Sequence, residues 1–274
     1  MGQRFVLRGR TALVTGAASG IGAALSLALA GRGCALALAD RDAQGLAETA
    51  RAARASGVTV SEHVLDLADR EALIALPEAV RARHGGLHLL VNNAGVALGG
   101  RFEDTDPADI DWLMDVNLHA VMRLTHACLP LLRAAPQAQI VNLSSVFGII
   151  APAEQAAYAA SKFAVRGFTE ALRHEYEGTG LGVTLVHPGG VATAIARNAR
   201  RPRHLDPHDA AQAHRAFERL LTMSPEKAAE AILRGIETRA PRVVIGADAR
   251  RALLIQRLMP VRYWSLIRRA VRDT

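Results

Sequence analysis

Seven short apolar runs, separated by longer segments rich in alanine, leucine and charged residues, leave few architectures open to this chain. The runs are continuously apolar and do not alternate with polar residues, which is typical of parallel strands buried on both faces. The longer segments have the composition of amphipathic helices. Because the two kinds of segment alternate, we expect an α/β fold: a doubly wound, Rossmann-like, seven-stranded parallel sheet with helices on both faces, in a single domain over residues 1–274.

The expected strands are Thr11–Thr15, Cys34–Ala39, Val58–Leu65, Leu87–Val91, Gln139–Leu143, Val183–Val186 and Arg242–Ile245. The expected helices are Gly20–Arg32, Ala43–Ala55, Arg70–Arg83, Ile110–Leu132 and Tyr158–Glu175. A fold of this kind binds ligands beyond the carboxyl ends of its strands. The residues that follow each apolar run are therefore the first candidates for a functional site.

The composition excludes several other classes of protein. No stretch of about 18 uncharged apolar residues occurs, and residues 1–10 lack the apolar core of a secretory signal, so we expect a cytoplasmic protein. Cys34 and Cys128 lie in apolar runs without partners at ligand spacing, which fits structural thiols in a reducing compartment. The ten histidines are dispersed, so no metal site is expected. The net charge of +7 comes from scattered arginines, which leaves nucleic-acid binding as a weak alternative.

A glycine-rich turn follows the first expected strand, in the order Thr15-Gly16-Ala17-Ala18-Ser19-Gly20-Ile21-Gly22. Gly16 can adopt backbone angles that other residues avoid, Gly20 lets the main chain approach a pyrophosphate, and Gly22 lets the helix pack closely on the strand. The start of the helix then offers free N–H groups and a partial positive charge to phosphates. Many glycine-rich turns serve packing alone, so the residues around this one decide its function.

Polar residues end the next expected strands. Asp40 lies 24 positions beyond Gly16, close to where a carboxylate accepts hydrogen bonds from an adenosine ribose. The competing interpretation of Asp40 is a solvated loop acid. Asp66 ends the third strand in the same way and is a candidate for contact with adenine, while small and amide residues at Asn92–Gly95 let the chain pass close to a flat cofactor.

Tyr158 and Lys162 are spaced i and i+4 on one expected helix, so their side chains share a face. A neighbouring ammonium favours the phenolate, so we expect Lys162 to lower the pKa of Tyr158 toward neutrality and make it a proton-transfer group. Ser145 lies 13 residues before Tyr158 and can hold the same substrate oxygen. Ser144 competes with Ser145, because neighbours on a strand point to opposite faces. Taken alone, a Tyr/Lys pair at this spacing is more often a surface pairing.

The motifs together resemble those of the short-chain dehydrogenase/reductase family over about Thr11 to Ile245. They are the TGxxxGIG turn at Thr15–Gly22, the NNAG at Asn92–Gly95, the serine at Ser145 and the YxxxK at Tyr158–Lys162. The resemblance implies that Asn117 completes a catalytic tetrad, holding the helix geometry and a water that connects the lysine to solvent. It also implies that Lys162 bonds the nicotinamide ribose, and that residues 188–193 lie beside the nicotinamide. There, Val191 would bond the carboxamide through its backbone and Thr193 through its hydroxyl.

The expected catalytic residues are Asn117, Ser145, Tyr158 and Lys162. The residues expected to bind the cofactor are Gly16, Ser19, Gly20, Ile21, Gly22, Asp40, Arg41, Asp66, Leu67, Asn93, Ala94, Gly95, Tyr158, Lys162, Pro188, Gly189, Val191 and Thr193. His187 is expected to be a hydrogen-bonded histidine at a strand end, with contact to the cofactor as the alternative.

The expected reaction is hydride transfer between a nicotinamide cofactor and a secondary alcohol or ketone. Asp40 would repel a 2′-phosphate, and Ser19 stands where relatives that prefer NADP often carry a basic residue, so NAD is favoured. Arg41 favours NADP instead, because an arginine can clamp a 2′-phosphate. An NADP-dependent carbonyl reductase and a dinucleotide-sensing scaffold without turnover are the alternatives. The intact set of Ser145, Tyr158 and Lys162 argues against the scaffold.

Two segments carry expectations about partners. Residues 194–213 are expected to be a mobile loop over the substrate, and its arginines either meet an anionic group or form a solvated face. Residues 249–274 form a basic amphipathic tail that packs on the core or a second subunit, walls a lipophilic substrate pocket, or lies on an anionic membrane surface. Packing is favoured and membrane contact least favoured. We expect a small-molecule substrate, no nucleic acid, and a homodimer or homotetramer.

Overall fold

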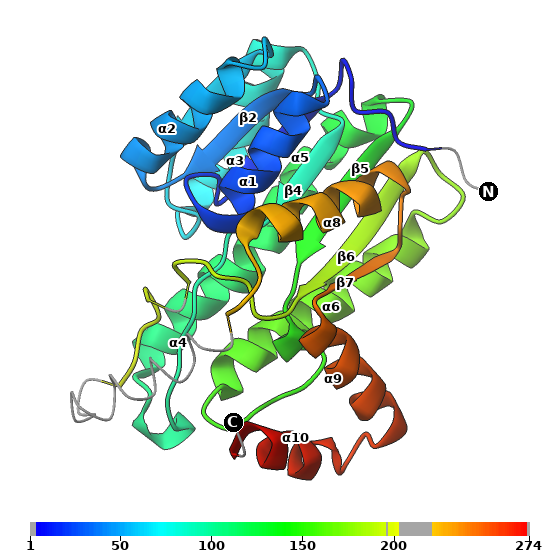
Figure 1. Ribbon diagram of the computed structural model, residues 1–274. Coiled ribbons are helices and arrows are strands. Elements are labelled where there is room, and N and C mark those ends of the chain that lie inside the picture. Colours follow the sequence, from blue (N-terminus) through cyan, green and yellow to red (C-terminus); the bar gives the residue numbers. More distant parts are fainter. Residues whose placement is uncertain (1–3, 196, 203–220, 273–274) are drawn as a thin grey trace.

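A seven-stranded parallel sheet in the order β3-β2-β1-β4-β5-β6-β7 forms the centre of the protein (Figure 1). The computed structural model describes residues 4–195, 197–202 and 221–272. The strands are β1 Thr11–Thr15, β2 Ala35–Asp40, β3 Val60–Val64, β4 Leu89–Asn92, β5 Ala138–Leu143, β6 Leu181–Pro188 and β7 Arg242–Ile245. The doubly wound α/β fold expected from the sequence is confirmed.

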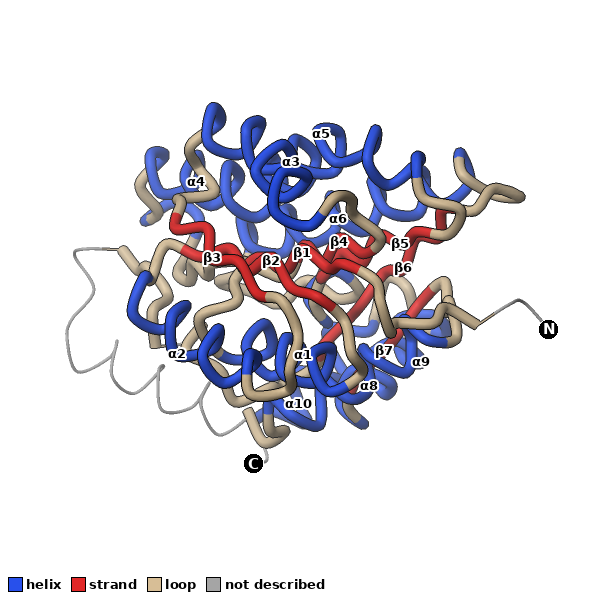
Figure 2. Tube along the Cα trace, turned by 90° about the horizontal axis from the view of Figure 1, so that it is seen from above, coloured by secondary structure: helices blue, strands red, loops and turns tan. Residues whose placement is uncertain are grey.

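Helices cover both faces of this sheet (Figure 2). Helices α1, α2, α8, α9 and α10 lie on one side, and α3, α4, α5 and α6 on the other. Their bounds are α1 Gly20–Gly31, α2 Ala43–Arg54, α3 Arg70–His84, α4 Pro107–Met114, α5 Ala120–Ala134, α6 Ala156–Glu175, α8 Pro225–Glu237, α9 Ala247–Leu258 and α10 Tyr263–Arg272. Short helical turns η1 Phe102–Asp104, η2 Asp115–His119 and η3 Val146–Gly148 connect them.

Two apolar cores lie on opposite faces of the sheet, because successive side chains of a strand point to opposite sides. On β1, Val14 packs in the core that contains Leu25 of α1, and its neighbour Leu13 packs in the core that contains Leu124 of α5. Leu13 and Val14 are both fully buried. Burial on both faces explains why the strands are continuously apolar in the sequence.

The order of the strands places the site. All the strands are parallel, so their carboxyl ends meet at one edge of the sheet. The connections run in opposite directions on either side of β1 and β4, and ligands of such sheets bind in the crevice at this switch point. The loops after β1 and β4 therefore border the candidate site.

Two expected segments are each divided in the structure. The expected helix Ile110–Leu132 is divided into α4 and α5 by a single π-helical turn, η2, in which Asn117 is buried. The expected tail consists of two helices, α9 and α10, and Pro260 lies between them. Proline has no N–H to continue a helical ladder, which accounts for the break. None of the described helices is long and apolar enough to cross a membrane.

Candidate active site

The glycine-rich turn forms a tight cradle between β1 and α1. Gly16 has a φ of +67°, and a Cβ there would lie 2.8 Å from the Cα of Ala94. A Cβ on Gly22 would collide with the carbonyl oxygen of Gly16. Ser19 is the N-cap of α1, yet its exposed side chain makes no capping hydrogen bond, so the first N–H groups of the helix remain available to a phosphate. These features fit a dinucleotide pyrophosphate.

Three further residues that are expected to bind the cofactor lie near the turn. Gly20 also has a positive φ, of +56°, and faces Thr193 of the segment after β6. Ile21 is half-buried and packs on the core beneath the turn. Arg41 is exposed at the start of the loop after β2.

Asp40 is fixed at the end of β2 by backbone donors. Its Oδ2 accepts a hydrogen bond from the N–H of Ala18 at 3.0 Å, and its Oδ1 accepts one from the N–H of Asp42 at 3.0 Å. Each carboxylate oxygen has further lone pairs to accept from a ligand hydroxyl. Asp40 therefore joins the glycine-rich turn to the end of β2, and the carboxylate points at the turn.

The segment after β4 connects the two ends of the site. Asn93 Nδ2 donates to the carbonyl oxygens of Thr15 and Gly16 at 2.8 and 3.2 Å. Ala94 lies against Gly16, and a Cβ on Gly95 would lie 3.2 Å from Lys162 Nζ. The same short segment therefore contacts the glycine-rich turn on one side and the lysine of α6 on the other.

The third strand contributes less to this crevice. Asp66 is exposed, and its Oδ1 accepts from the N–H of Ala68 at 2.9 Å within its own loop. Leu67 lines a small cavity together with Thr15 and Ala94, which places it beside the crevice between β1 and β4.

The two neighbouring serines at the end of β5 have separate partners. The hydroxyl of Ser144 donates to the carbonyl oxygen of Lys162 at 2.8 Å and is buried. Ser145 Oγ accepts from the N–H of Phe147 at 3.1 Å, and the Ser145 side chain is close enough to Tyr158 to lower the pKa of the phenol. Ser144 thus supports α6, whereas Ser145 and Tyr158 lie together.

Lys162 and Asn117 lie next to each other beneath Tyr158. Lys162 Nζ donates to the carbonyl oxygen of Leu143 at 3.2 Å. The same Nζ lies 5.8 Å from the centre of the Tyr158 ring. Asn117 exchanges two hydrogen bonds with the backbone of Val96: its Oδ1 accepts at 2.8 Å and its Nδ2 donates at 3.0 Å. The same Nδ2 donates to Ser161 at 3.1 Å. The amide therefore ties the segment after β4 to α6.

The expectation that Lys162 lowers the pKa of Tyr158 is wrong for this structure. Burial raises the pKa of Tyr158 to about 12, and the hydrogen bond with Ser145 offsets only part of this effect. Lys162 is itself buried, and burial lowers the pKa of its ammonium to about 8. Both groups are shielded from water, and this desolvation disfavours the charged form of each.

His187 is buried and hydrogen-bonded at the end of β6, as expected, and its partner is the backbone of Ser145, a contact that the sequence analysis did not predict. His187 Nδ1 donates to the carbonyl oxygen of Ser145 at 2.8 Å, and its Nε2 accepts from Arg242 Nη2 at 3.3 Å. Arg242 also pairs with Glu170 at 3.4 Å. Burial lowers the pKa of His187 to about 4, so the imidazole is neutral at physiological pH. The only signal in the sequence was the position of His187 at the end of an apolar run.

The segment after β6 crosses toward the glycine-rich turn. Pro188 is buried at the end of the strand, and Gly189 donates its N–H to Ile245 at 2.9 Å. Val191 forms a parallel bridge with Met223 in which the donors are the N–H groups of Ala192 and Met223. This pattern directs the N–H and carbonyl of Val191 to the opposite side, where they are available to a ligand.

The substrate side of Tyr158 is apolar. Tyr158 clusters with Leu98, Leu113 and Trp112, and Phe147 packs edge-on against its ring at 6.1 Å. Part of the expected loop 194–213 lies outside the described residues. In the described part, Arg200 stacks on Trp112 with its guanidinium carbon 3.6 Å from the ring centre. Arg200 also pairs with Asp109 at 2.7 Å.

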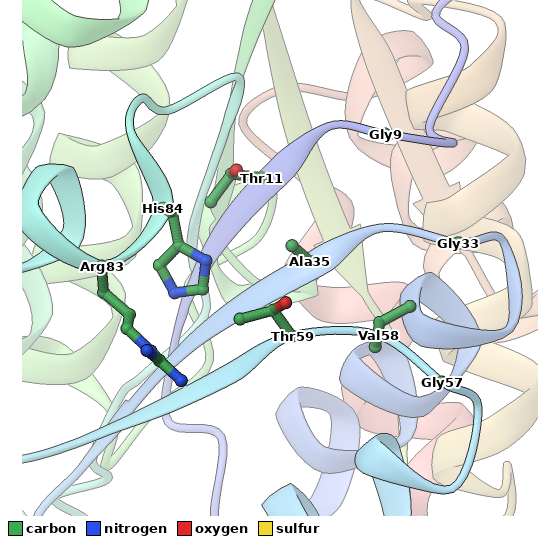
Figure 3. Close-up of a pocket in the computed structure, with 9 residues that line it drawn as sticks. All are labelled: Gly9, Thr11, Gly33, Ala35, Gly57, Val58, Thr59, Arg83 and His84. Carbon is green, nitrogen blue, oxygen red and sulfur yellow. The ribbon is translucent and has the colours of Figure 1, made fainter.

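A separate hollow opens at the amino ends of β1, β2 and β3, on the opposite edge of the sheet (Figure 3). Arg83 and His84 are the only ionisable side chains among its nine lining residues. Thr11, at the start of β1, lies at one side of it. No group of three potential metal ligands occurs among the described residues. The carboxyl edge of the sheet is therefore the candidate active site.

Comparison with known proteins agrees with this geometry. The short chain dehydrogenase family model matches residues 10–204. The "Putative oxidoreductase SadH" of Mycobacterium tuberculosis is 44% identical over 262 residues, covering 94% of each chain. A short chain dehydrogenase/reductase from Burkholderia phymatum, solved in complex with NAD, superposes with a TM-score of 0.86 at 29% identity, covering 93% of this chain and 95% of that one. The chain therefore belongs to the short-chain dehydrogenase family of oxidoreductases.

Proposed function

We propose that the protein interconverts a secondary alcohol and a ketone, with Tyr158 as the group that moves the proton. The observation that supports this most strongly is the segment after β4. Ala94 contacts the glycine-rich turn that fits a pyrophosphate, and Gly95 faces Lys162 beneath Tyr158. A dinucleotide that begins at the turn and follows this segment ends beside the phenol.

Each residue of the reacting end has a role in this proposal. When bound, the nicotinamide dinucleotide accepts or supplies the hydride. The Ser145 hydroxyl, which lies beside Tyr158, orients the substrate oxygen. Tyr158 gives a proton to that oxygen or takes one from it. Lys162 places a positive charge below the phenol, and Asn117 fixes the distance between α6 and the segment after β4.

NAD is the cofactor that this proposal favours. Two backbone donors hold the carboxylate of Asp40 at the glycine-rich turn, so a 2′-phosphate there would meet a fixed negative charge. The structural relatives from Burkholderia phymatum and Mycobacterium paratuberculosis were both solved with NAD, the second at 25% identity and a TM-score of 0.78. The exposed Arg41 keeps NADP as the alternative.

A lipophilic substrate fits the walls of the site. Leu98, Leu113 and Trp112 surround Tyr158, and Phe147 belongs both to this cluster and to the next one, which contains Ile149. Apolar contacts of this kind favour a substrate whose carbon chain or ring leaves water on binding.

A panel of secondary alcohols and ketones tests the proposed function. Small, steroidal and acyl-linked compounds are each assayed with NAD and NADP, in both directions, by the absorbance of the reduced nicotinamide. We expect turnover with at least one lipophilic member and a higher kcat/KM with NAD. Cofactor binding without turnover on the whole panel would favour the dinucleotide-sensing scaffold, and preference for NADP would favour the carbonyl reductase.

A further inference from the structure

The outward face of α9 and of the turn that follows it exposes an apolar stripe. Leu254, Leu258 and Val261 are 57%, 71% and 89% exposed. Leu254 and Leu258 are four residues apart and lie on one side of α9, and Val261 lies in the turn that follows the helix. Leu266 of α10 is 40% exposed. We call these four residues the tail stripe.

The packing role expected for this tail is carried by its other face. Ala249 and Ala252 are buried, and Leu253, Tyr263 and Ile267 pack on a cluster with Ile149 and Ile150. The hydroxyl of Tyr263 accepts a hydrogen bond from the N–H of Ala151 at 3.0 Å. The tail stripe is therefore not needed to attach the two helices to the domain. In Figure 1 the helices lie at the end of the molecule where β7 finishes.

Arginines border the tail stripe, and carboxylates do not. Residues 249–272 contain no aspartate or glutamate. Among the side chains that the structure describes here, up to residue 268, the exposed arginines are Arg250, Arg251, Arg257, Arg262 and Arg268. Within the part of the chain that the structure describes, none of the five lies in an ion pair. The face thus combines exposed apolar side chains with charged groups that are all positive.

We propose that this face binds the surface of an anionic lipid membrane. Apolar side chains between arginines enter the boundary between headgroups and acyl chains while the guanidinium groups meet the lipid phosphates. A second copy of the chain fits less well, because a two-fold interface would place these arginines against the same arginines of the partner. Nucleic acid would engage the arginines but leave the tail stripe in water.

In this orientation, helix α9 lies between the lipid and the loop that follows Ser145. Helix α9 contacts η3, the turn that directly follows Ser145. A lipophilic substrate dissolved in the membrane would then have a short path to Tyr158. The membrane contact itself does not depend on the proposed reaction, and the experiment below contains no activity assay.

Co-sedimentation with vesicles tests the proposal on the full-length protein. Vesicles of phosphatidylcholine alone are compared with vesicles that contain phosphatidylglycerol, at low and physiological salt. We expect binding to the anionic vesicles only, weakened by salt. The triple variants Leu254→Ser/Leu258→Ser/Val261→Ser and Arg250→Gln/Arg257→Gln/Arg262→Gln should each lower the partition coefficient about tenfold or more.

A matched control separates this face from exposed apolar residues in general. Val64 and Ile74 are 58% and 54% exposed on β3 and α3, so Val64→Ser/Ile74→Ser should bind vesicles like the parent protein. Melting temperatures of all variants confirm that they are folded. The proposal would be overturned if the parent did not bind anionic vesicles, or if both triple variants bound them as strongly as the parent does. A different result would also overturn it: a dimer of the parent, measured by sedimentation velocity, that dissociates in Leu254→Ser/Leu258→Ser/Val261→Ser, together with no vesicle binding by the parent.

Discussion

The two halves of the site differ in the groups that form them. The nucleotide half lies on β1 and β2, and the reacting half lies on β5 and α6. In the nucleotide half, small residues and backbone N–H groups form the cradle, and Asp40 is held from the main chain. In the reacting half, Tyr158, Lys162 and Asn117 are buried side chains. The difference teaches that changes in the first half should alter cofactor affinity and choice, whereas changes in the second should alter turnover.

Tyr158→Phe should separate the two halves most strongly. The variant keeps the ring that packs on Phe147 but has no hydroxyl to move a proton. We expect kcat to fall by roughly 10²- to 10⁴-fold, with the dissociation constant for NAD nearly unchanged. Tyr176→Phe, a half-buried tyrosine at the end of α6, is the matched control and should leave both unchanged. Near-normal turnover in Tyr158→Phe would show that Tyr158 does not move the proton.

Gly22→Ala should damage the nucleotide half. The added Cβ would collide with the Gly16 carbonyl oxygen, so either the turn or α1 must move. We expect a loss of about 1–3 kcal/mol in the free energy of unfolding and weaker NAD binding, measured by denaturant titration and calorimetry. Gly31→Ala, in the same helix with open space around it, should cause neither loss. Equal behaviour of the two variants would show that the cradle is not tight.

His187→Ala tests the support behind the reacting half. Removing the imidazole takes away the hydrogen bond to the Ser145 carbonyl oxygen, a loss of about 1–3 kcal/mol for a buried partner. We expect kcat to fall about tenfold with the NAD dissociation constant unchanged, and partial recovery in His187→Asn. Since the pKa of His187 lies at about 4, the imidazole titrates only below pH 5, and the defect should be the same from pH 6 to 9. A change confined to cofactor affinity would contradict this role.

Asp40→Asn should produce the smallest change, in cofactor choice. The amide removes the negative charge but can keep one of the backbone hydrogen bonds. We expect the ratio of kcat/KM for NAD to that for NADP to fall about tenfold, equivalent to about 1.4 kcal/mol. Glu48→Gln, an exposed acid on α2, is the control. An unchanged ratio would mean that Asp40 does not meet the ribose.

The sequence predicted the fold and the pairing of Tyr158 with Lys162 because both depend on local patterns, whereas Asn117 was expected only from the resemblance to a family. Continuous apolar runs identify buried parallel strands, and the YxxxK spacing places Tyr158 and Lys162 on one face of α6. The contact between His187 and Ser145 could not be predicted, since it joins residues 42 positions apart through the pairing of β5 with β6. The predicted direction of the pKa shift of Tyr158 was wrong, because the spacing of Tyr158 and Lys162 does not tell how deeply the two side chains are buried.

The ionisation of Tyr158 in the cofactor complex tests the central claim most directly. The protein has three tyrosines, so labelling with ¹³Cζ-tyrosine gives three signals, and Tyr158→Phe identifies the one of interest. In the free protein the pKa of Tyr158 should be about 12. Bound oxidised NAD would supply a positive charge near the phenol, so we expect the pKa to fall toward the neutral range in its presence. A Tyr158 signal that titrates at the same high pH with and without bound NAD would contradict the account.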